Sequence, residues 1–315
     1  MSRPLTFDLR QTVIDRMDLG TRFLLSQKCP ALRRTNQRCP DKATTVEIKK
    51  DSVRINNTTF YVKKYQSGQH MEISEDDGDS KKVILKTTVP LRVAKKKLFE
   101  TIMKRRSGVV KIKNLSIIGD LNLPPNLKLC VRNLKVAKPA FSFLEDFSEK
   151  QRRTSTLIVD LQKVLTADSF PLESLEMDYN FAVISNIPTK TLITTRQQFS
   201  MEGPAHEPVD IHRIHVKNCV SDWLDAGYLV ARWQMSKPEI GRHWSLEGCY
   251  NVVDSIYTAA AKAPGAQKRF SGNGFFGDVT FPIDEEKVLN VFIEVVEKEN
   301  GTEEYEVHFK VDPKL

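Results

Sequence analysis

The sequence lacks a long apolar run and has few of the residues that mark export or a structural metal site. No run among its 315 residues reaches the roughly 18 apolar residues of a membrane-spanning helix, and the opening MSRPLTFDLRQ has no apolar signal-peptide core. The five cysteines are odd in number and widely spaced, and no two form a C-x-x-C pair. We therefore expect a protein that is cytoplasmic or nuclear, not secreted, and without membrane contact.

Signatures of catalysis, cofactor binding and metal binding are also missing. Residues 272–277 match the letters G-x-G-x-x-G, but a dinucleotide loop needs a helix after it, and the strand-like DVTFP follows here. His212 and His215 are three apart, so on a strand their side chains would point to opposite faces. No grouping of Ser, His and Asp or of Cys and His has a family-specific local signature. The sequence thus predicts a non-enzymatic protein with no catalytic residues, no cofactor and no metal.

The net charge of +8 permits nucleic-acid binding, but the charge is unevenly spread. Residues 92–113 hold nine basic side chains against one acid, Glu100, whereas residues 284–306 hold nine acids. The basic run lacks the interleaved aromatic residues on which single-stranded bases stack, and no zinc-finger or RRM signature is present. A solvated helix face is therefore favoured, and a basic nucleic-acid-binding protein is the least favoured alternative.

The centre of the sequence repeats a pattern of short apolar triplets. In IHRIHVKNC, Ile211, Ile214 and Val216 occupy the leucine positions of L-x-x-L-x-L-x-x-N/C, and Cys219 closes the unit. Triplets of similar spacing start at residues 112, 131, 154, 172 and 189. Such apolar rows are buried only when neighbouring strands stack, so the spacing predicts an irregular leucine-rich-repeat-like array. Half-buried strands of an ordinary α+β domain would match the same loose template, and that alternative stays open.

The flanking segments have different periods. Apolar residues recur every four residues from Leu5 to Met17, which predicts a short amphipathic helix. Alternating residues from 46 to 85 predict an antiparallel meander, and two alternating runs around the Asn-Gly pair at 300–301 predict a C-terminal β-hairpin. The expected fold class is therefore α+β, with a helical segment over 1–40, the meander over 41–90, the repeat-like β/α array over 91–240 and a β-rich region over 241–315.

Two parts of the N-terminal region resemble a shortened F-box. In that motif an apolar first helix is followed by an arginine, a Leu-Ser pair, a cysteine and a closing leucine, and the chain has LTFDLRQTVIDRM at 5–17 and RFLLSQKCPAL at 22–32. The strand pattern VRINNTTF at 53–60, the segment 115–134 and WQMSKPEIG at 233–241 are similar to a large nematode family of uncharacterised F-box-related proteins. The resemblance spans most of the chain and makes residues 1–40 an F-box-like helical segment.

This resemblance implies a substrate-recruiting F-box-like subunit of a cullin-RING ubiquitin ligase. Its partners would be a Skp-type adaptor, a cullin scaffold and a protein target of unknown identity. Apolar residues at this spacing suit a helix that inserts into a groove, and the adaptor-binding residues would be Leu5, Leu9, Val13, Met17 and Leu24. The alternative is a protein-binding scaffold with no ubiquitin-ligase link, in which these side chains pack against the chain's own meander.

Residues between the inward-facing positions of the array would form a partner-binding face. They carry both signs of charge, which suits a protein partner better than a phosphate backbone. The predicted residues of this face are Lys113, Ser116, Arg132, Lys135, Glu176, Asp178, Tyr179, His215 and Lys217.

Overall fold

The chain divides into two compact units, Met1–Leu172 and Glu173–Leu315. The computed structural model describes residues 12–14, 16–17, 19–32, 42–49, 52–65, 68–75, 83–87, 93, 109–118, 127–137, 161–177, 187–195, 211–219, 226–269, 277–298 and 301–314. Within these ranges, every helix is too short or too polar to cross a membrane.

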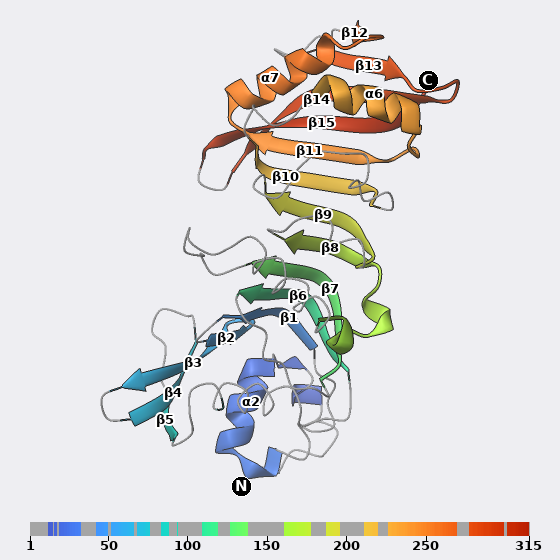
Figure 1. Cartoon of the computed structure of the whole chain (residues 1–315). Helices are drawn as coiled ribbons and strands as arrows, with labels where there is room; N and C mark the ends of the chain where they lie inside the picture. The colour runs from blue at the N-terminus through green and yellow to red at the C-terminus, as the bar shows by residue number, and fades with distance from the viewer. Residues whose placement is uncertain are drawn as a thin grey trace. The chain divides into compact units, whose positions relative to one another are not determined.

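The first unit is a β-sheet accompanied by short helical segments. Its strands follow the order β7-β6-β1-β2-β3-β4-β5 (Figure 1). The elements are α2 (Leu19–Lys28), β1 (Lys42–Ile48), β2 (Ser52–Ile55), β3 (Thr58–Tyr65), β4 (Gly68–Glu75), β5 (Val83–Thr87), β6 (Val110–Ile118), β7 (Leu129–Ala137) and the 3-10 turn η1 (Ala167–Ser169).

Strands β1, β6 and β7 pair in parallel with their apolar positions in register. Val46 of β1 lies opposite Leu115 of β6, which lies opposite Leu134 of β7. Ile117 and Val136 form the next step of the same buried surface, and all five side chains are buried. The triplets that start at 112 and 131 are therefore adjacent strands with their apolar residues on one face.

From β1 the sheet continues as the antiparallel series β1-β2-β3-β4-β5, as the alternation from 46 to 85 predicts. The turn between β2 and β3 contains Asn56, whose φ of 51° lies in the left-handed region that asparagine tolerates better than most residues. Its side-chain Oδ1 accepts the backbone N–H groups of Thr44 and Thr45 at 2.9 and 3.0 Å. This one side chain therefore ties the turn to the neighbouring strand β1.

The second unit is also a β-sheet, with the strand order β12-β13-β14-β15-β11-β10-β9-β8 (Figure 1). Strands β9, β10 and β11 pair in parallel, and β11, β15, β14, β13 and β12 pair antiparallel. The elements are β8 (Leu172–Met177), β9 (Thr189–Thr195), β10 (Arg213–Cys219), α6 (Ala226–Ser236), β11 (His243–Gly248), α7 (Tyr250–Ala261), β12 (Gln267–Arg269), β13 (Asp278–Pro282), β14 (Lys287–Glu297) and β15 (Glu303–Pro313).

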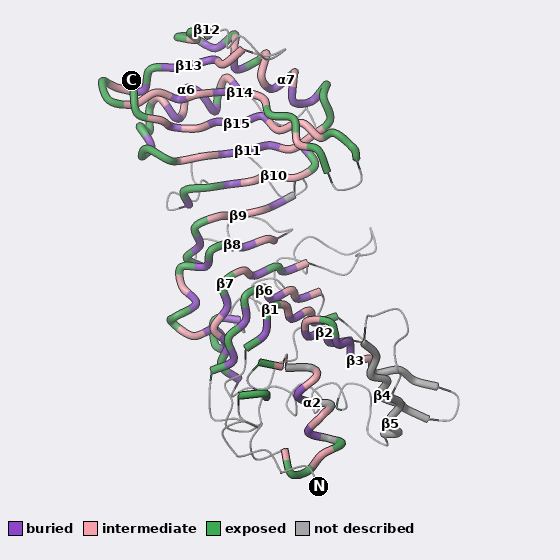
Figure 2. Tube along the Cα trace, turned by 180° about the vertical axis from the view of Figure 1, so that it is seen from behind, coloured by how far each residue is buried: buried purple, intermediate pink, exposed green. Residues whose placement is uncertain are grey.

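Helices α6 and α7 cover one face of this second sheet (Figure 1). Under them runs a row of register partners, Ile214, Trp244, Phe309 and Val291, each of which is buried. Trp233 of α6 is fully buried and meets Trp244 edge to face, with ring centroids 5.6 Å apart and an interplanar angle of 83°. The core of the unit therefore lies between the helices and one face of the sheet. Buried and less buried residues alternate along its strands (Figure 2).

The α+β fold class expected from the sequence is wrong, because the structure is mostly a mixed β-sheet with few helices among the described residues. In each unit a parallel block continues into an antiparallel block through one shared strand, β1 in the first and β11 in the second. The leucine-rich-repeat-like β/α array and the F-box-like helical segment are therefore not separate parts of this architecture. Alternating apolar residues identify a strand, but they do not fix its neighbour or its direction.

Of two local elements of the second unit, the alternation of apolar residues predicted the C-terminal hairpin but not helix α7. The expected C-terminal hairpin is present, since β14 pairs with β15 from Lys287 opposite Pro313 to Glu297 opposite Glu303. Gly301 in its connection has a φ of 76°, a conformation that favours glycine. Helix α7 departs from the β-rich region predicted over 241–315, since twelve residues within that region, Tyr250–Ala261, are helical.

Candidate functional site

The face of the second sheet opposite α6 and α7 carries polar side chains, and we call the part formed by β10, β11, β15 and β14 the open face. Side chains alternate between the two faces of a strand, so the residues flanking the buried row all point to this side. No described helix lies on it (Figure 2). Its polar residues are Arg213, His215, Lys217, His243, Ser245, Glu247, Asn290, Glu294, Glu304, Glu306, His308, Lys310 and Asp312.

The strand register arranges these side chains in rows that cross the sheet. The first row contains the two bases Arg213 and Lys310, with His243 between them and Asn290 beyond Lys310, and Asp312 pairs with Lys310 at 2.8 Å. The third row, Glu247, Glu306 and Glu294, is acidic. The middle row contains His215, Ser245 and His308. Charge therefore changes from positive to negative along the strand direction.

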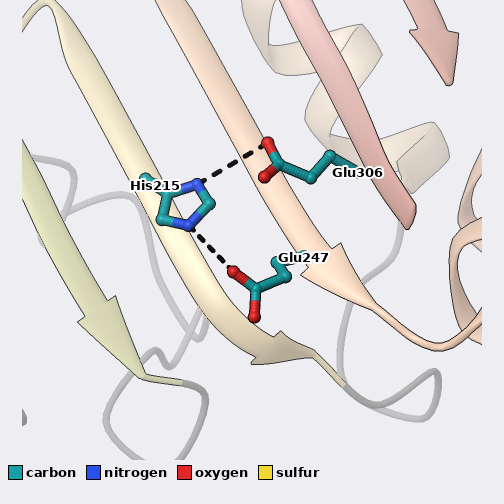
Figure 3. A group of neighbouring side chains, drawn as sticks. All are labelled: His215, Glu247 and Glu306. Carbon is teal, nitrogen blue, oxygen red and sulfur yellow. Dashed lines mark hydrogen bonds and ion pairs between the residues drawn. The ribbon is translucent and has the colours of Figure 1, made fainter. Parts of the chain in front are cut away.

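His215 of β10 contacts residues of the neighbouring strand β11 and, one strand further across the sheet, Glu306 of β15 (Figure 3). Its Nδ1 is 2.7 Å from Oγ of Ser245, and its Nε2 is 3.3 Å from Oε2 of Glu247. Oε2 of Glu306 is 3.9 Å from Nδ1 of the same ring. We call His215, Glu247 and Glu306 the His-Glu cluster, and all three side chains are half-buried.

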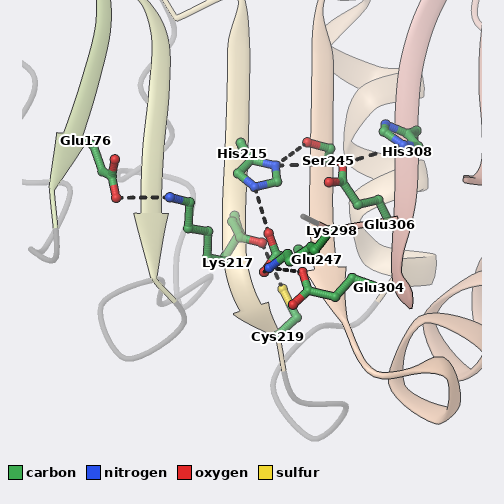
Figure 4. Close-up of polar contacts among 11 residues, drawn as sticks. Glu176, His215, Lys217, Cys219, Ser245, Glu247, Lys298, Glu304, Glu306 and His308 are labelled. Atoms are coloured by element: carbon green, nitrogen blue, oxygen red, sulfur yellow. Dashed lines mark hydrogen bonds and ion pairs between the residues drawn. The ribbon is translucent and has the colours of Figure 1, made fainter. Parts of the chain in front are cut away.

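A second set of charges surrounds Glu247 (Figure 4). Lys298 lies 3.4 Å from Oε1 of Glu247 and forms an ion pair with Glu304. The hydrogen bond from Lys298 outweighs the effect of burial and lowers the pKa of Glu304, while the same bond raises the pKa of Lys298. Burial raises the pKa of Glu306; His215 opposes this shift, and Glu247 and other nearby carboxylates add to it.

His243 and His308 form a stacked pair beside the His-Glu cluster. Their ring centroids are 5.2 Å apart, and Nε2 of His243 is 3.0 Å from Nδ1 of His308. Burial, followed by repulsion from His308, lowers the pKa of His243 to about 4, and burial, followed by repulsion from His215, lowers the pKa of His308 to about 4. Both imidazoles are therefore neutral at pH 7, and the 3.2 Å approach of Glu294 to Nε2 of His308 is not an ion pair at that pH.

The structure separates the residues predicted to form the partner-binding face. His215 and Lys217 lie on the open face of the second unit, where Nζ of Lys217 is 3.0 Å from Oε1 of Glu176. Asp178 and Tyr179 lie outside the described residues. Four residues lie on the first unit, where Ser116 is half-buried opposite Lys135 and the others are exposed: Lys113, Ser116, Arg132 and Lys135.

The predicted adaptor-binding residues fall in the N-terminal region. Leu5 and Leu9 lie outside the described residues, and the side chain of Leu24 is not described. Val13 is 44% exposed and Met17 is half-buried. The grouping of these side chains on one surface stays a prediction.

The sequence reasoning found His215 but missed the residues around it. Polar residues alternate in HWSLEG, where Ser245 and Glu247 share a face, and in EYEVH, where Glu306 and His308 share one. This alternation could have indicated that both strands have one apolar face and one polar face. It could not have shown that β15, about 60 residues further along the chain, pairs with β11.

The second unit thus defines a class of protein domain: a mixed β-sheet with helices on one face and a polar face of mixed charge on the other. The chain belongs to the family described as "Domain of unknown function (DUF3557)", which matches residues 90–249, about half of the chain. Neither the curated proteins nor the solved structures contain a match to the chain. The matched residues include His215, Ser245 and Glu247, whereas Glu306 and His308 follow them.

Proposed function

We propose that the protein is a non-enzymatic interaction module whose open face binds a protein segment carrying both signs of charge. The observation that supports this most directly is the two-sided second sheet, in which helices cover the apolar face and the polar face lacks a described helical cover. A polar face that is only hydrated does not require any particular order of its charges. Here the charges lie in ordered rows, which a partner with the opposite order would complement.

The distribution of acids argues against a nucleic-acid partner for this face. Glu247, Glu294 and Glu306 lie in one row, and Glu304 follows on the same face. A phosphate backbone attracted to Arg213 and Lys310 would be repelled by this acidic row, which lies four residues, or roughly 13 Å, further along the strands. A protein segment can present an acid toward the first row and a base toward the third.

Charge reversal on the open face tests this proposal. The double variant Arg213→Glu with Glu294→Lys changes two exposed side chains of the open face without changing the net charge. The matched control is Lys262→Glu with Glu285→Lys, which changes two exposed residues outside that face. We expect proteins captured by the wild type and by the control, measured by quantitative mass spectrometry, to drop at least about tenfold with the open-face variant. Equal recovery by all three proteins would contradict the proposal.

We also propose the recruiting role that the F-box resemblance implies, with a Skp-type adaptor at the N-terminal region. The exposure of Val13 beside the buried Ile14 supports this role. An exposed apolar side chain on a helix can serve as an anchor for a partner. The test is co-purification with a Skp-type adaptor. Val13→Asp should abolish it, whereas Lys28→Asp on the exposed surface of α2 should not.

A further inference from the structure

We propose that His215, Glu247 and Glu306 bind one divalent transition-metal ion, for which Zn²⁺ is the reference. One ligand atom from each residue lies within 4.8 Å of the others. The three residues come from β10, β11 and β15, so strands far apart in the sequence bring them together (Figure 3). This inference does not depend on the proposed protein partner.

The distance between the first two ligands already fits a metal ion. Two ligand atoms about 2.0–2.1 Å from a tetrahedral Zn²⁺ lie roughly 3.3 Å apart. Nε2 of His215 is 3.3 Å from Oε2 of Glu247. Oε2 of Glu306 is 3.9 Å from Nδ1, the other ring nitrogen, so the Glu306 side chain would have to swing toward Nε2 to supply the third ligand.

Ser245 can hold the imidazole in the form that binds a metal. Its Oγ is 2.7 Å from Nδ1 of His215, and a hydroxyl can either donate to this nitrogen or accept from it. Without a metal, the Nε2–H group can donate to Glu247 while the serine donates to Nδ1. With a metal, the Nδ1–H group donates to the serine, which leaves the Nε2 lone pair facing Glu247 and an ion between them.

A neighbouring buried group points to the same place. His308 is only 5% exposed, and its Nε2 makes no hydrogen bond of acceptable geometry, although Oε2 of Glu294 lies 3.2 Å from it and Oε2 of Glu306 lies 3.7 Å from it. A buried polar atom without a hydrogen bond is costly, and a metal ion beside Glu306 would give it a partner. His308 could thereby become a fourth ligand, with Nδ1–H donating to Nε2 of His243 at 3.0 Å.

The donor set selects the class of ion. An imidazole nitrogen with two carboxylates suits Zn²⁺ and its transition-metal neighbours, whereas Ca²⁺ and Mg²⁺ take oxygen ligands. The two carboxylates balance the charge of a divalent ion. Lys298 approaches the other oxygen of Glu247, Oε1, at 3.4 Å and so leaves Oε2 available.

The test uses the full chain, purified with a chelator and then dialysed free of it. Zn²⁺ affinity is measured by calorimetry, and Co²⁺ absorption reports the ligand types. We expect the wild type and His212→Ala to bind one ion with a dissociation constant of about 1 µM or tighter. His212 is the matched control, because it adjoins the same strand but is exposed and 3.9 Å from Glu239. His215→Ala and the isosteric Glu306→Gln should each weaken binding at least about tenfold.

Three results would overturn the site: no binding by the wild type up to about 100 µM, wild-type affinity in His215→Ala and in Glu306→Gln, or a cobalt spectrum dominated by thiolate charge transfer. Circular dichroism and thermal unfolding of each variant exclude misfolding as the cause of lost binding. Glu306→Gln keeps the shape of the side chain, so it stays informative if His215→Ala fails to fold. At one Zn²⁺ concentration, binding should also raise the thermal midpoint of the wild type by more than that of Glu306→Gln.

Discussion

Nε2 of His243 lies 3.0 Å from Nδ1 of His308, and the two rings stack on the open face of the second unit. One imidazole must donate and the other accept, so the contact requires at least one of them to be neutral. The charged groups that act on His243 are Arg213 from β10 and Lys310 and Asp312 from β15, and the two bases further disfavour its protonation. The pair therefore couples the stability of this sheet to pH.

Acidification should destabilise the protein between about pH 6.5 and pH 4. The pKa values of both histidines are lowered to about 4 in the folded chain, so the unfolded chain takes up protons first as the pH falls. The stabilisation is complete above the unfolded pKa of about 6.5 and is lost as the pH falls toward 4. We expect a loss of about 3–5 kcal/mol for the pair, after a discount for the partly exposed His243.

Urea unfolding at pH 7 and pH 5, with a chelator present, measures this dependence. His308→Gln removes one member of the pair, so its free energy of unfolding should fall less between the two pH values than that of the wild type. His212→Gln, on an exposed side chain, should keep the dependence of the wild type. If His308→Gln and the wild type showed the same pH dependence, the lowered pKa values would not contribute to stability.

Removing the indole of Trp233 should destabilise the second unit strongly. The side chain is fully buried in α6 and packs edge to face on Trp244 of β11. Trp233→Ala removes this contact and leaves a cavity, which costs about 3–5 kcal/mol. Met235 on the same helix is 84% exposed, so Met235→Ala should change stability by less than about 0.5 kcal/mol. If Trp233→Ala lowered the free energy of unfolding as little as Met235→Ala, the packing of α6 on this core would not contribute to stability.

Asn56 should be the critical residue of the β2–β3 turn. Asn56→Ala removes the two hydrogen bonds to β1 and puts a less tolerant residue at a φ of 51°, for an expected loss of about 2–3 kcal/mol. Asn56→Gly keeps the backbone conformation and loses only the hydrogen bonds, so its loss should be smaller. Asn57→Ala changes an exposed neighbour and serves as the control. Thermal unfolding should show the largest loss of stability for Asn56→Ala, a smaller loss for Asn56→Gly and the smallest for Asn57→Ala. A different order would contradict this role of the Asn56 side chain.

Ser245→Ala should weaken Zn²⁺ binding while leaving all three proposed ligands in place. The variant loses the 2.7 Å contact that orients the His215 imidazole, and such second-layer contacts change metal affinity by about 10- to 100-fold. Thr280→Ala changes a buried hydroxyl on β13, which is not a strand of the open face, and should leave the affinity unchanged. Calorimetry with Zn²⁺ gives both values, and an unchanged affinity for Ser245→Ala would show that the serine does not position the ligand.

The sequence predicted strands better than it predicted their arrangement. The triplet spacing placed Leu115 and Leu134 at equivalent positions, and they are register partners in a parallel pair. The same pattern could not show that β1 is the next strand of that block, because its register partners in β6 lie 69 residues further along the chain, as for Val46 and Leu115. Parallel pairing is long-range and leaves no mark in a local window, so the α+β class was inferred instead of a mixed sheet.

The candidate site was harder to predict for a related reason. Each strand contributes only one or two residues to the site. A metal site was excluded because only His212 and His215, which lie on one strand, were compared. That argument was correct for those two residues, since His215 is half-buried in the cluster and His212 is exposed. The relevant neighbours, Glu247 and Glu306, lie across the sheet from His215.

Cross-linking of the protein to a captured partner, read by mass spectrometry, tests the central proposal most directly. Lys217, Lys298 and Lys310 lie on or beside the open face, whereas Lys262 and Lys268 are exposed outside it. An interaction through the open face predicts that the partner is cross-linked to the first three lysines and that Arg213→Glu with Glu294→Lys removes these cross-links. Cross-links confined to Lys262 and Lys268, and unchanged by that variant, would contradict it.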